Sequence, residues 1–362
     1  SACPACGKHI RFYDNIPLIS YIMLGRKCRY CKAPISPRYF IIELITGLTF
    51  VFTYYLFFQS PLRPNIPPFL EHGWVIYLIT IILLAALIAS SAIDLELWII
   101  PLCICWFVTI LGIIASAVAP LLIDPKIISG YRLLPYASAA TGALAAGAAA
   151  GLVISLVLLA TGVIKRSYDV PKEQSKDDAT KNADEALSQG ENSAQPAPGQ
   201  AEPQFNHRTE VMHEMLFLLP IIVCSIFAYW LTTNNPAVRD WWLNFSQRPV
   251  VAGLLGSIFG YFVGCSIVWA TRIWGTLVFK KEAMGLGDVH LMGAAGAVIG
   301  PLLVTVAFFV APFFGLAWAI FQMFFKKTRQ IPYGPFLSLG IFTCIILHNA
   351  VWGHFLVLIG QR

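Results

Sequence analysis

Charged residues are scarce in this chain of 362 residues. Asp, Glu, Lys and Arg make up 12% of the sequence, whereas about 25% is usual for soluble proteins. Hydrophobic residues make up 57%, and the mean hydropathy is +0.69. Because so few polar groups cannot cover a water-exposed surface, the composition argues against a soluble globular enzyme.

The few charges gather in two segments. Residues 1–40 hold seven Lys or Arg residues and a single acid, Asp14, while residues 165–210 hold six basic and nine acidic residues. The other 276 residues carry only 21 charges. This distribution predicts a polytopic membrane protein with a basic N-terminal module and one polar insertion. The net charge of +6 suits a module that faces a membrane from the cytoplasm, and we do not interpret it as a sign of nucleic-acid binding.

Apolar segments of about 17–25 residues, the length that crosses a bilayer, can be placed at nine positions. They are residues 41–58, 74–93, 98–119, 136–164, 213–233, 250–278, 289–306, 307–325 and 337–359. The continuous apolar run 289–325 is too long for one upright span, and Pro301 and Pro312 can break it, so we expect a hairpin there. The sequence therefore predicts an all-α polytopic membrane protein with about nine transmembrane helices.

Glycines recur at helical spacing in two of these segments. They are Gly256, Gly260 and Gly264 in the first, and Gly296 and Gly300 in the second. Small residues that recur every fourth position let the backbones of two membrane helices approach closely. We therefore expect close helix packing at these positions and no further role.

Lys and Arg residues near the span ends predict the orientation, because such residues are retained on the cytoplasmic side. If the N-terminal module is cytoplasmic, the inner ends collect 15 of these residues and the outer loops hold 6. We therefore expect four parts. They are a small cytoplasmic module at 1–40, membrane helices at 41–164, a disordered cytoplasmic loop at 165–211, and further membrane helices at 212–362.

Four of the nine cysteines form two Cys-x2-Cys motifs, Cys3 with Cys6 and Cys28 with Cys31, with 21 residues between the pairs. Two such turns can place four thiolates tetrahedrally around one Zn²⁺ at about 2.3 Å. A metal with four sulfur ligands has no open coordination position, so we expect structural zinc. Two disulfides and a redox-active motif are the alternatives. The cytoplasmic orientation disfavours the first, and the presence of two pairs disfavours the second.

Two isolated acids are the candidate functional residues of the membrane region. Residues 75–123 carry only two charges, Asp94 and Glu96, and Asp288 follows two glycines in the sequence GLGD. An ionisable group at the edge of a span is costly to desolvate and is a functional candidate for that reason. Each acid also has a structural interpretation, Asp94 as a solvated helix-end charge and Asp288 as a helix N-cap.

The predicted topology places Asp94 and Asp288 on one face of the membrane, because an even number of spans, four, separates them. Two adjacent carboxylates share one proton, so one can act as a base on water while the other donates to a carbonyl oxygen. This is the chemistry of an aspartic protease. Glu96 is interpreted as a solvated helix-end charge. The alternatives are that it tunes the pKa of Asp94 or that it binds basic residues of the substrate.

On these residues the sequence resembles the bacterial prepilin peptidases, also called type IV leader peptidases, which are polytopic GxGD aspartic proteases. The resemblance rests on four stretches in the family's order. They are CPACGKHIRFYDNIPLISYIMLGRKCRYCKAPISPRYFIIELITG at 3–47, AIDLELWIIP at 92–101, KKEAMGLGDVHLMGAAGAVIG at 280–300, and IPYGPFLSLG at 331–340.

The resemblance implies that Asp94 and Asp288 are the catalytic aspartates and that the four cysteines form the family's cytoplasmic module. It implies removal of the basic leader from type IV prepilins or type II secretion pseudopilins, at a Gly–Phe-type junction on the cytoplasmic side of the bacterial inner membrane. Many members also methylate the new N-terminus with S-adenosylmethionine. No glycine-rich motif for such a cofactor can be read here, so methylation rests on the resemblance alone.

The sequence departs from the family pattern at several points. The helix that usually precedes the cysteines is absent and the chain begins at Ser1, so we expect a truncated N-terminus. Leu97, Leu102 and His290 replace a usual His, acid and Lys, and these changes could alter how the carboxylates share a proton. His290 lies on another helix face than Asp288, so we expect no direct pairing. Residues 121–248 have no counterpart in the compact family pattern.

Two functions of other classes compete with the protease. A multi-span transporter with functional acidic residues would place polar groups deep within its spans and has no use for the cysteine module. A membrane scaffold that uses the zinc module for assembly would tolerate the loss of either aspartate. Expected partners are prepilin or pseudopilin and membrane lipid, with no nucleic acid, and the sequence predicts no oligomeric state.

Overall fold

The computed structural model describes residues 2–3, 5–16, 18–63, 65–164, 207–325, 332–358 and 360. Within these ranges the regular structure is helical, and no β-strand occurs beyond two isolated β-bridges near the N-terminus. The predicted all-α class is therefore confirmed.

Seven helices are long and apolar enough to cross a membrane in the described part of the chain. They are α2 (Pro37–Phe58), α3 (Trp74–Leu97), α4 (Leu102–Leu122), α6 (Ala139–Ala160), α8 (His207–Asn234), α10 (Pro249–Phe279) and α12 (Pro301–Phe325). The bent pair α13 (Gly334–Ile346) and α14 (His348–Leu358) makes an eighth if it counts as one span. The shorter elements are η1 (Phe12–Asn15), α1 (Ile19–Met23), η2 (Phe69–Gly73), α5 (Pro125–Tyr131), α9 (Pro236–Ser246) and α11 (Leu286–Ile299).

The predicted hairpin at 289–325 is present, but its turn lies earlier than expected. Helix α11 has 14 residues and ends before Gly300, whose φ of 86° is accessible to glycine without strain. Pro301 then begins α12, and Pro312 lies inside that helix. Because α11 is too short to span a bilayer, the predicted 289–306 span is not a full one.

The last predicted span, 337–359, is also broken. Helices α13 and α14 meet at an angle of 77° around Leu347. Residues 207–211, which were expected in the disordered loop, form the first part of α8. The rest of that predicted loop, residues 165–206, lies outside the described residues.

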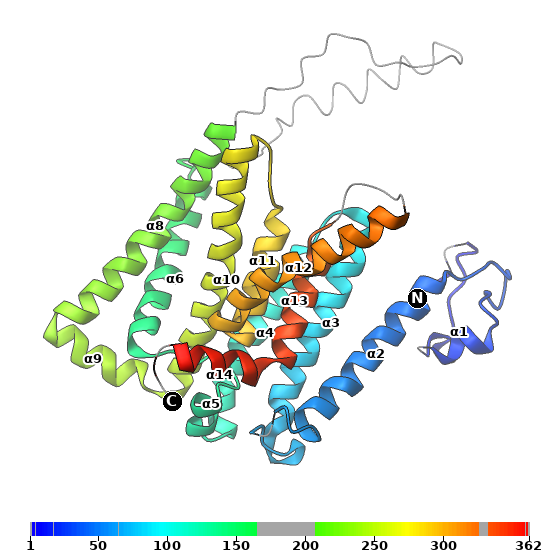
Figure 1. Ribbon diagram of the computed structural model, residues 1–362, viewed down its shortest axis with the longest axis horizontal. Coiled ribbons are helices and arrows are strands. Elements are labelled where there is room, and N and C mark those ends of the chain that lie inside the picture. Colours follow the sequence, from blue (N-terminus) through cyan, green and yellow to red (C-terminus); the bar gives the residue numbers. More distant parts are fainter. Residues whose placement is uncertain are drawn as a thin grey trace, which may run out of the picture.

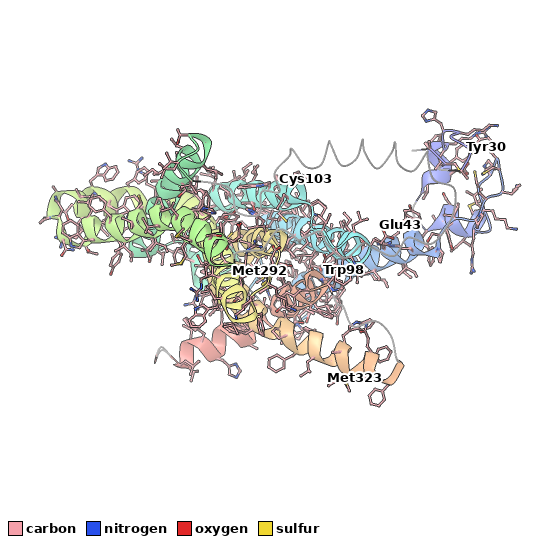
Figure 2. The ribbon with its side chains drawn as sticks, turned by 90° about the horizontal axis from the view of Figure 1, so that it is seen from above. Tyr30, Glu43, Trp98, Cys103, Met292 and Met323 are labelled. Carbon is pink, nitrogen blue, oxygen red and sulfur yellow. The ribbon has the colours of Figure 1, made fainter. Side chains whose placement is uncertain are left out.

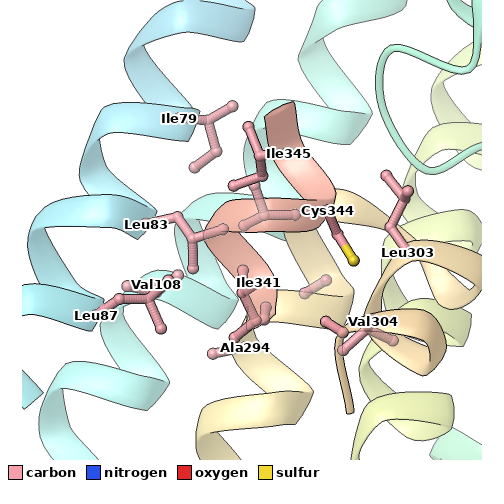
Figure 3. Packing of buried hydrophobic residues seen from close by; sticks show 14 of the residues in the cluster. Ile79, Leu83, Leu87, Val108, Ala294, Leu303, Val304, Ile341, Cys344 and Ile345 are labelled. Carbon is pink, nitrogen blue, oxygen red and sulfur yellow. The ribbon is translucent and has the colours of Figure 1, made fainter. Parts of the chain in front are cut away.

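Helices α4, α10 and α11 pack closely at the centre of the molecule, with α3, α12 and α13 beside them. Figure 3 shows the apolar side chains where α3, α4, α11, α12 and α13 meet, including Leu83, Val108 and Ile341. Close packing of this kind stabilises helix contacts within lipid, because the hydrophobic effect does not drive helices together there.

The glycines provide the close approach that their spacing predicted. A Cβ atom at Gly260 would lie 2.1 Å from the carbonyl oxygen of Gly296, and a Cβ at Gly296 would lie 2.1 Å from that of Gly260. A Cβ atom at Gly264 would likewise lie 2.3 Å from the carbonyl oxygen of Met292. These contacts fix α11 against α10, and α11 carries Asp288 in its first turn.

The C-terminal ends of α3 and α10 and the N-terminal ends of α11 and α13 lie toward the upper end of the bundle in Figure 1. Helices α5, α9 and α14 lie toward the lower end. The N-terminal module stands to one side at the start of α2, and Figure 2 shows Tyr30 of this module well away from Met292 in the bundle.

Candidate active site

Asp94 lies in the last turn of α3, where the helix ends at a left-handed residue, Trp98. Its side chain is buried, with 6% of the residue exposed. The Oδ2 atom accepts a hydrogen bond of 3.1 Å from the backbone N–H of Gly334, at the start of α13. This carboxylate is therefore held by an element far away in the sequence.

Asp288 lies in the first turn of α11, and 9% of the residue is exposed. Burial raises the pKa of this carboxyl, and the nearby Asp94 raises it further. The backbone N–H of Gly285 and the guanidinium of Arg272 act in the opposite direction. Like charges that approach in a dry site favour one shared proton, so the pair fits the predicted dyad.

Ile100 joins the segments that carry the two acids. A Cβ atom at Gly287 would lie 2.7 Å from Cβ of Ile100, and a Cβ at Gly334 would lie 3.2 Å from its Cδ1. The same Cβ at Gly334 would lie 2.6 Å from Oδ2 of Asp94. Glycine is thus needed at both positions for the three segments to meet.

The structure brings together the two acids that the sequence singled out, and adds residues that sequence reasoning did not assign a role. Gly334 is one of these, and Tyr333 is another, because burial and the charge of Asp288 raise the pKa of its phenol to about 12. Both belong to the stretch IPYGPFLSLG, which contributed to the resemblance but carries no ionisable residue other than a tyrosine. Only the resemblance of this stretch to the family could have indicated Gly334 and Tyr333 from the sequence.

Glu96 and His290 have side-chain partners other than the two aspartates. Glu96 is paired with Arg38 at the start of α2, and its side chain is 57% exposed. The Nδ1 atom of His290 lies 3.1 Å from the hydroxyl of Tyr261, and its ring packs near that of Trp106. These contacts agree with the expectation that His290 does not pair with the dyad.

The four cysteines of the module also come together. Their sulfur atoms all lie within 4.8 Å of one another, and those of Cys3 and Cys31 are 3.9 Å apart. Four sulfurs at 2.3 Å around a tetrahedral zinc ion would be about 3.8 Å apart. The spacing therefore fits a single zinc ion, and the expected metal-binding cluster is present.

The two motifs fold into the same turn. In each, the N–H of the first cysteine donates to the carbonyl oxygen five residues later, and its own carbonyl accepts from the N–H four residues later. The residues at that fourth position, Gly7 and Lys32, both have positive φ. Backbone N–H groups of Cys31 and Tyr30 lower the pKa of the Cys28 thiol to about 6, which favours the thiolate that binds metal.

Two contacts tie the second turn to η1 and the module to α2. Arg29 donates two hydrogen bonds, of 2.6 and 2.7 Å, to the carboxylate of Asp14. The N–H of Leu18 donates to Oε2 of Glu43 on α2 at 2.9 Å. The module is thus fixed to the first membrane helix, which in turn contacts the end of α3 through Arg38.

Known protein families match two segments of the chain. Residues 1–57 match the bacterial peptidase A24 N-terminal domain, and residues 214–320 match the type IV leader peptidase family. The first segment contains the four cysteines and the second contains Asp288, while Asp94 lies outside both. Because the second match begins at residue 214, the expectation that all of 121–248 lacks a counterpart in the family is wrong.

Several curated proteins are similar to this chain. A type 4 prepilin-like proteins leader peptide-processing enzyme of Escherichia coli O78:H11 is 40% identical over 347 residues, which cover 96% of this chain and 75% of the relative. The prepilin leader peptidase/N-methyltransferase of Myxococcus xanthus is 41% identical over 103 residues, or 28% of this chain and 26% of the relative. The prepilin leader peptidase/N-methyltransferase of Pseudomonas aeruginosa is 58% identical over 48 residues, which cover 13% of this chain and 17% of the relative.

No solved structure matches this chain. The matches to the Myxococcus and Pseudomonas proteins span about a quarter or less of those relatives. The match to the Escherichia coli protein, in contrast, extends over nearly the whole of this chain and three quarters of the relative. The chain therefore belongs to the type IV leader peptidase family.

Proposed function

We propose that this protein is an aspartic endopeptidase of the bacterial inner membrane that removes the leader peptide of type IV prepilins or type II secretion pseudopilins. Asp94 and Asp288 are the proposed catalytic dyad. The observation that carries the proposal is that these two buried carboxyls, at positions 94 and 288, lie on segments that both pack against Ile100, and that Asp94 acts electrostatically on Asp288. The relatives' names, which specify leader processing, support the same reaction.

The dyad acts in its singly protonated form. The ionised carboxylate takes a proton from a water molecule, which attacks the scissile carbonyl carbon, while the protonated carboxyl donates its proton to the carbonyl oxygen. The carboxyl that took the proton from water then passes it to the leaving amine, and the other carboxylate recovers its proton from a hydroxyl of the tetrahedral intermediate as the intermediate breaks down. Burial and the nearby Asp94 raise the pKa of Asp288, and this favours Asp288 as the acid and Asp94 as the base.

The proposed active site faces the cytoplasm. The 15 Lys and Arg residues at the predicted inner ends, against 6 in the outer loops, support this orientation. The N-terminal module would then lie on the same side as the acids. Its four cysteines would hold a zinc ion that stabilises the module, in keeping with their spacing.

Cleavage of a prepilin with a Gly–Phe junction tests the proposal. Membranes that contain the wild type or either of the variants Asp94→Asn and Asp288→Asn are incubated with this substrate, and the shortened product is measured. We expect each variant to lose activity by about 100-fold or more, because general acid and base catalysis contributes 10²–10⁴-fold. The matched control is Asp240→Asn, which removes an acid whose side chain is 71% exposed on α9.

Retained cleavage by either variant, at equal protein level, would rule out the dyad. A scaffold that uses the zinc module would tolerate both substitutions, and a transporter would not process the substrate. Methylation of the new N-terminus is a second proposed activity, supported by the N-methyltransferase named in several relatives. Mass spectrometry of the product, with and without S-adenosylmethionine, detects it as one added methyl group.

A further inference from the structure

A completely buried arginine lies beside the segment that leads to Asp288. Arg272, on α10, has none of its side chain exposed, and its Nε donates a hydrogen bond of 2.8 Å to Oε1 of Glu214 on α8. Its Nη1 lies 2.8 Å from Oε1 of Glu282 and donates to the carbonyl oxygen of Met284. One guanidinium thus connects α8 and α10 to the segment between α10 and α11.

Glu214 is the buried partner in this arrangement. Its side chain is 3% exposed, whereas that of Glu282 is 47% exposed and competes with water for its contacts. The indole N–H of Trp269 donates to the second oxygen of Glu214 at 3.1 Å, so both carboxylate oxygens are used. A buried guanidinium is costly without a desolvated partner of opposite charge, and Glu214 supplies that partner.

The segment held by Arg272 is short. Six residues, 280–285, connect α10 to α11, and Met284 lies four residues before Asp288. Ala283 also packs tightly on α10, since a Cβ atom at Gly275 would lie 2.5 Å from Cβ of Ala283. A displacement of this segment would therefore move the first turn of α11 and the carboxyl that it carries.

We propose that Glu214 is a positioning residue for Asp288, acting through Arg272. Glu214 holds the guanidinium in place, the guanidinium holds residues 282–284, and these fix the start of α11. The inference rests on the proposed function for its kinetic consequences, while the ordering of the segment is independent of that function. It gives α8 a role in the active site that the sequence did not indicate.

The first measurement is steady-state cleavage with the full-length protein. In Glu214→Gln we expect kcat to fall about 10- to 100-fold with little change in KM, because a displaced catalytic group costs about 100-fold per ångström. Glu214→Asp, which keeps the charge, should recover part of the loss. Asp240→Asn, which breaks the exposed ion pair with Arg239, is the matched control and should behave as wild type.

The pH profile gives a readout that a purely structural role would not move. The charges that act on Asp288 are those of Asp94 on α3 and Arg272 on α10, and its neutral titratable neighbours are Cys105 on α4 and Tyr333 before α13. Arg272→Met removes a positive charge that lowers the pKa of Asp288, so the alkaline limb of the pH–rate profile should move to higher pH. Glu214→Gln leaves that positive charge less neutralised, so the limb should move to lower pH.

Hydrogen exchange of the purified protein tests the ordering itself. We expect Glu214→Gln to increase exchange at residues 280–288 and to leave α3 and α13 unchanged, even if wild type fails to cleave the prepilin. If that variant folds poorly, Trp269→Phe removes one hydrogen bond to Glu214 while keeping an aromatic ring near Phe217, and should show the same pattern more weakly. Wild-type kcat, pH profile and exchange in correctly folded Glu214→Gln or Trp269→Phe would overturn the proposal.

Discussion

Among the described residues, the carboxylate of Asp94 accepts a hydrogen bond from a backbone N–H and none from a side chain. The N–H of Gly334 donates to its Oδ2 atom, and the space where a side chain would begin at Gly334 is already filled by that oxygen. A glycine at the start of α13 therefore determines where the first acid of the proposed dyad lies.

Gly334→Ala should impair cleavage without removing any ionisable group. The new Cβ would lie 2.6 Å from Oδ2 of Asp94, a contact too short to persist, so either the carboxylate or α13 must move. We expect kcat/KM to fall about 10- to 100-fold. Gly353→Ala on α14 is the control, because nothing lies within 4 Å of its Cβ position. Equal activity of the two variants would show that Asp94 tolerates displacement.

The proton of Asp288 should be retained at higher pH than that of an exposed aspartic acid, whose pKa is about 3.9. Burial and the neighbouring Asp94 both raise its pKa. Because the acid form is needed for donation to the substrate, kcat/KM should fall as pH rises through the raised pKa, and activity should persist well above pH 4. A pH series of initial rates measures this, and an activity confined to strongly acidic conditions would contradict it.

At this scale the sequence identified the two isolated acids and missed the residues whose role depends on their spatial neighbours. Asp94 and Asp288 stand out because ionised groups are rare in apolar segments. Gly334 contributes only a backbone N–H and a lack of side chain, and neither can be recognised without its spatial neighbours. Arg272 receives no role in the sequence analysis, because nothing in the sequence indicates that Glu214 lies beside it.

Among the structural elements, the N-terminal module is the one that we expect to depend on a bound metal. Its described part is held by two matching turns, one pair of ionic hydrogen bonds and the four cysteines, with little apolar burial. Below about 40 residues a fold usually needs a metal, a disulfide or a partner for stability.

Cys28→Ser, or treatment with a strong chelator, should unfold the module and leave the bundle folded. Loss of one of four thiolate ligands weakens zinc binding, and the binding free energy is part of the folding free energy. We expect one zinc ion per chain in wild type by elemental analysis and less than one in the variant. The variant should also be cut faster by trypsin at the Lys and Arg residues between positions 8 and 32. Cys103→Ser, an exposed cysteine on α4 outside the cluster, is the control. Wild-type proteolysis in metal-free protein would contradict the role of zinc.

Helix boundaries were predictable where apolar runs end in polar residues, and less so elsewhere. The ends of α3, α6 and α10 lie within a few residues of the predicted spans. The boundaries of α11 and α13 were missed because Gly300 and Leu347 interrupt runs that stay apolar on both sides. Hydropathy measures the environment of a segment and carries no information about a bend inside that environment.

For the whole molecule, the even number of spans between the two acids was the decisive prediction. Although α11 is too short to span and the last span is bent, Asp94 and Asp288 still lie on one side, because four described helices of spanning length, α4, α6, α8 and α10, lie between them. Counting helices up to Asp288 does not depend on how the chain continues after it. Errors of the span prediction beyond that point therefore leave the predicted dyad unaffected.

The orientation of the whole molecule is the remaining prediction. If Lys and Arg residues hold the inner ends in the cytoplasm, the α2–η2 connection faces outward and the end of α6 faces inward. A protease site inserted after Gln59 should be cut by protease added to spheroplasts, whose outer membrane has been opened, whereas one inserted after Gly162 should be cut only in inside-out vesicles. Both positions are exposed, so access to them depends on membrane side and not on burial. The reverse pattern would place Asp94 and Asp288 on the outer face, where no leader peptide awaiting export could reach them.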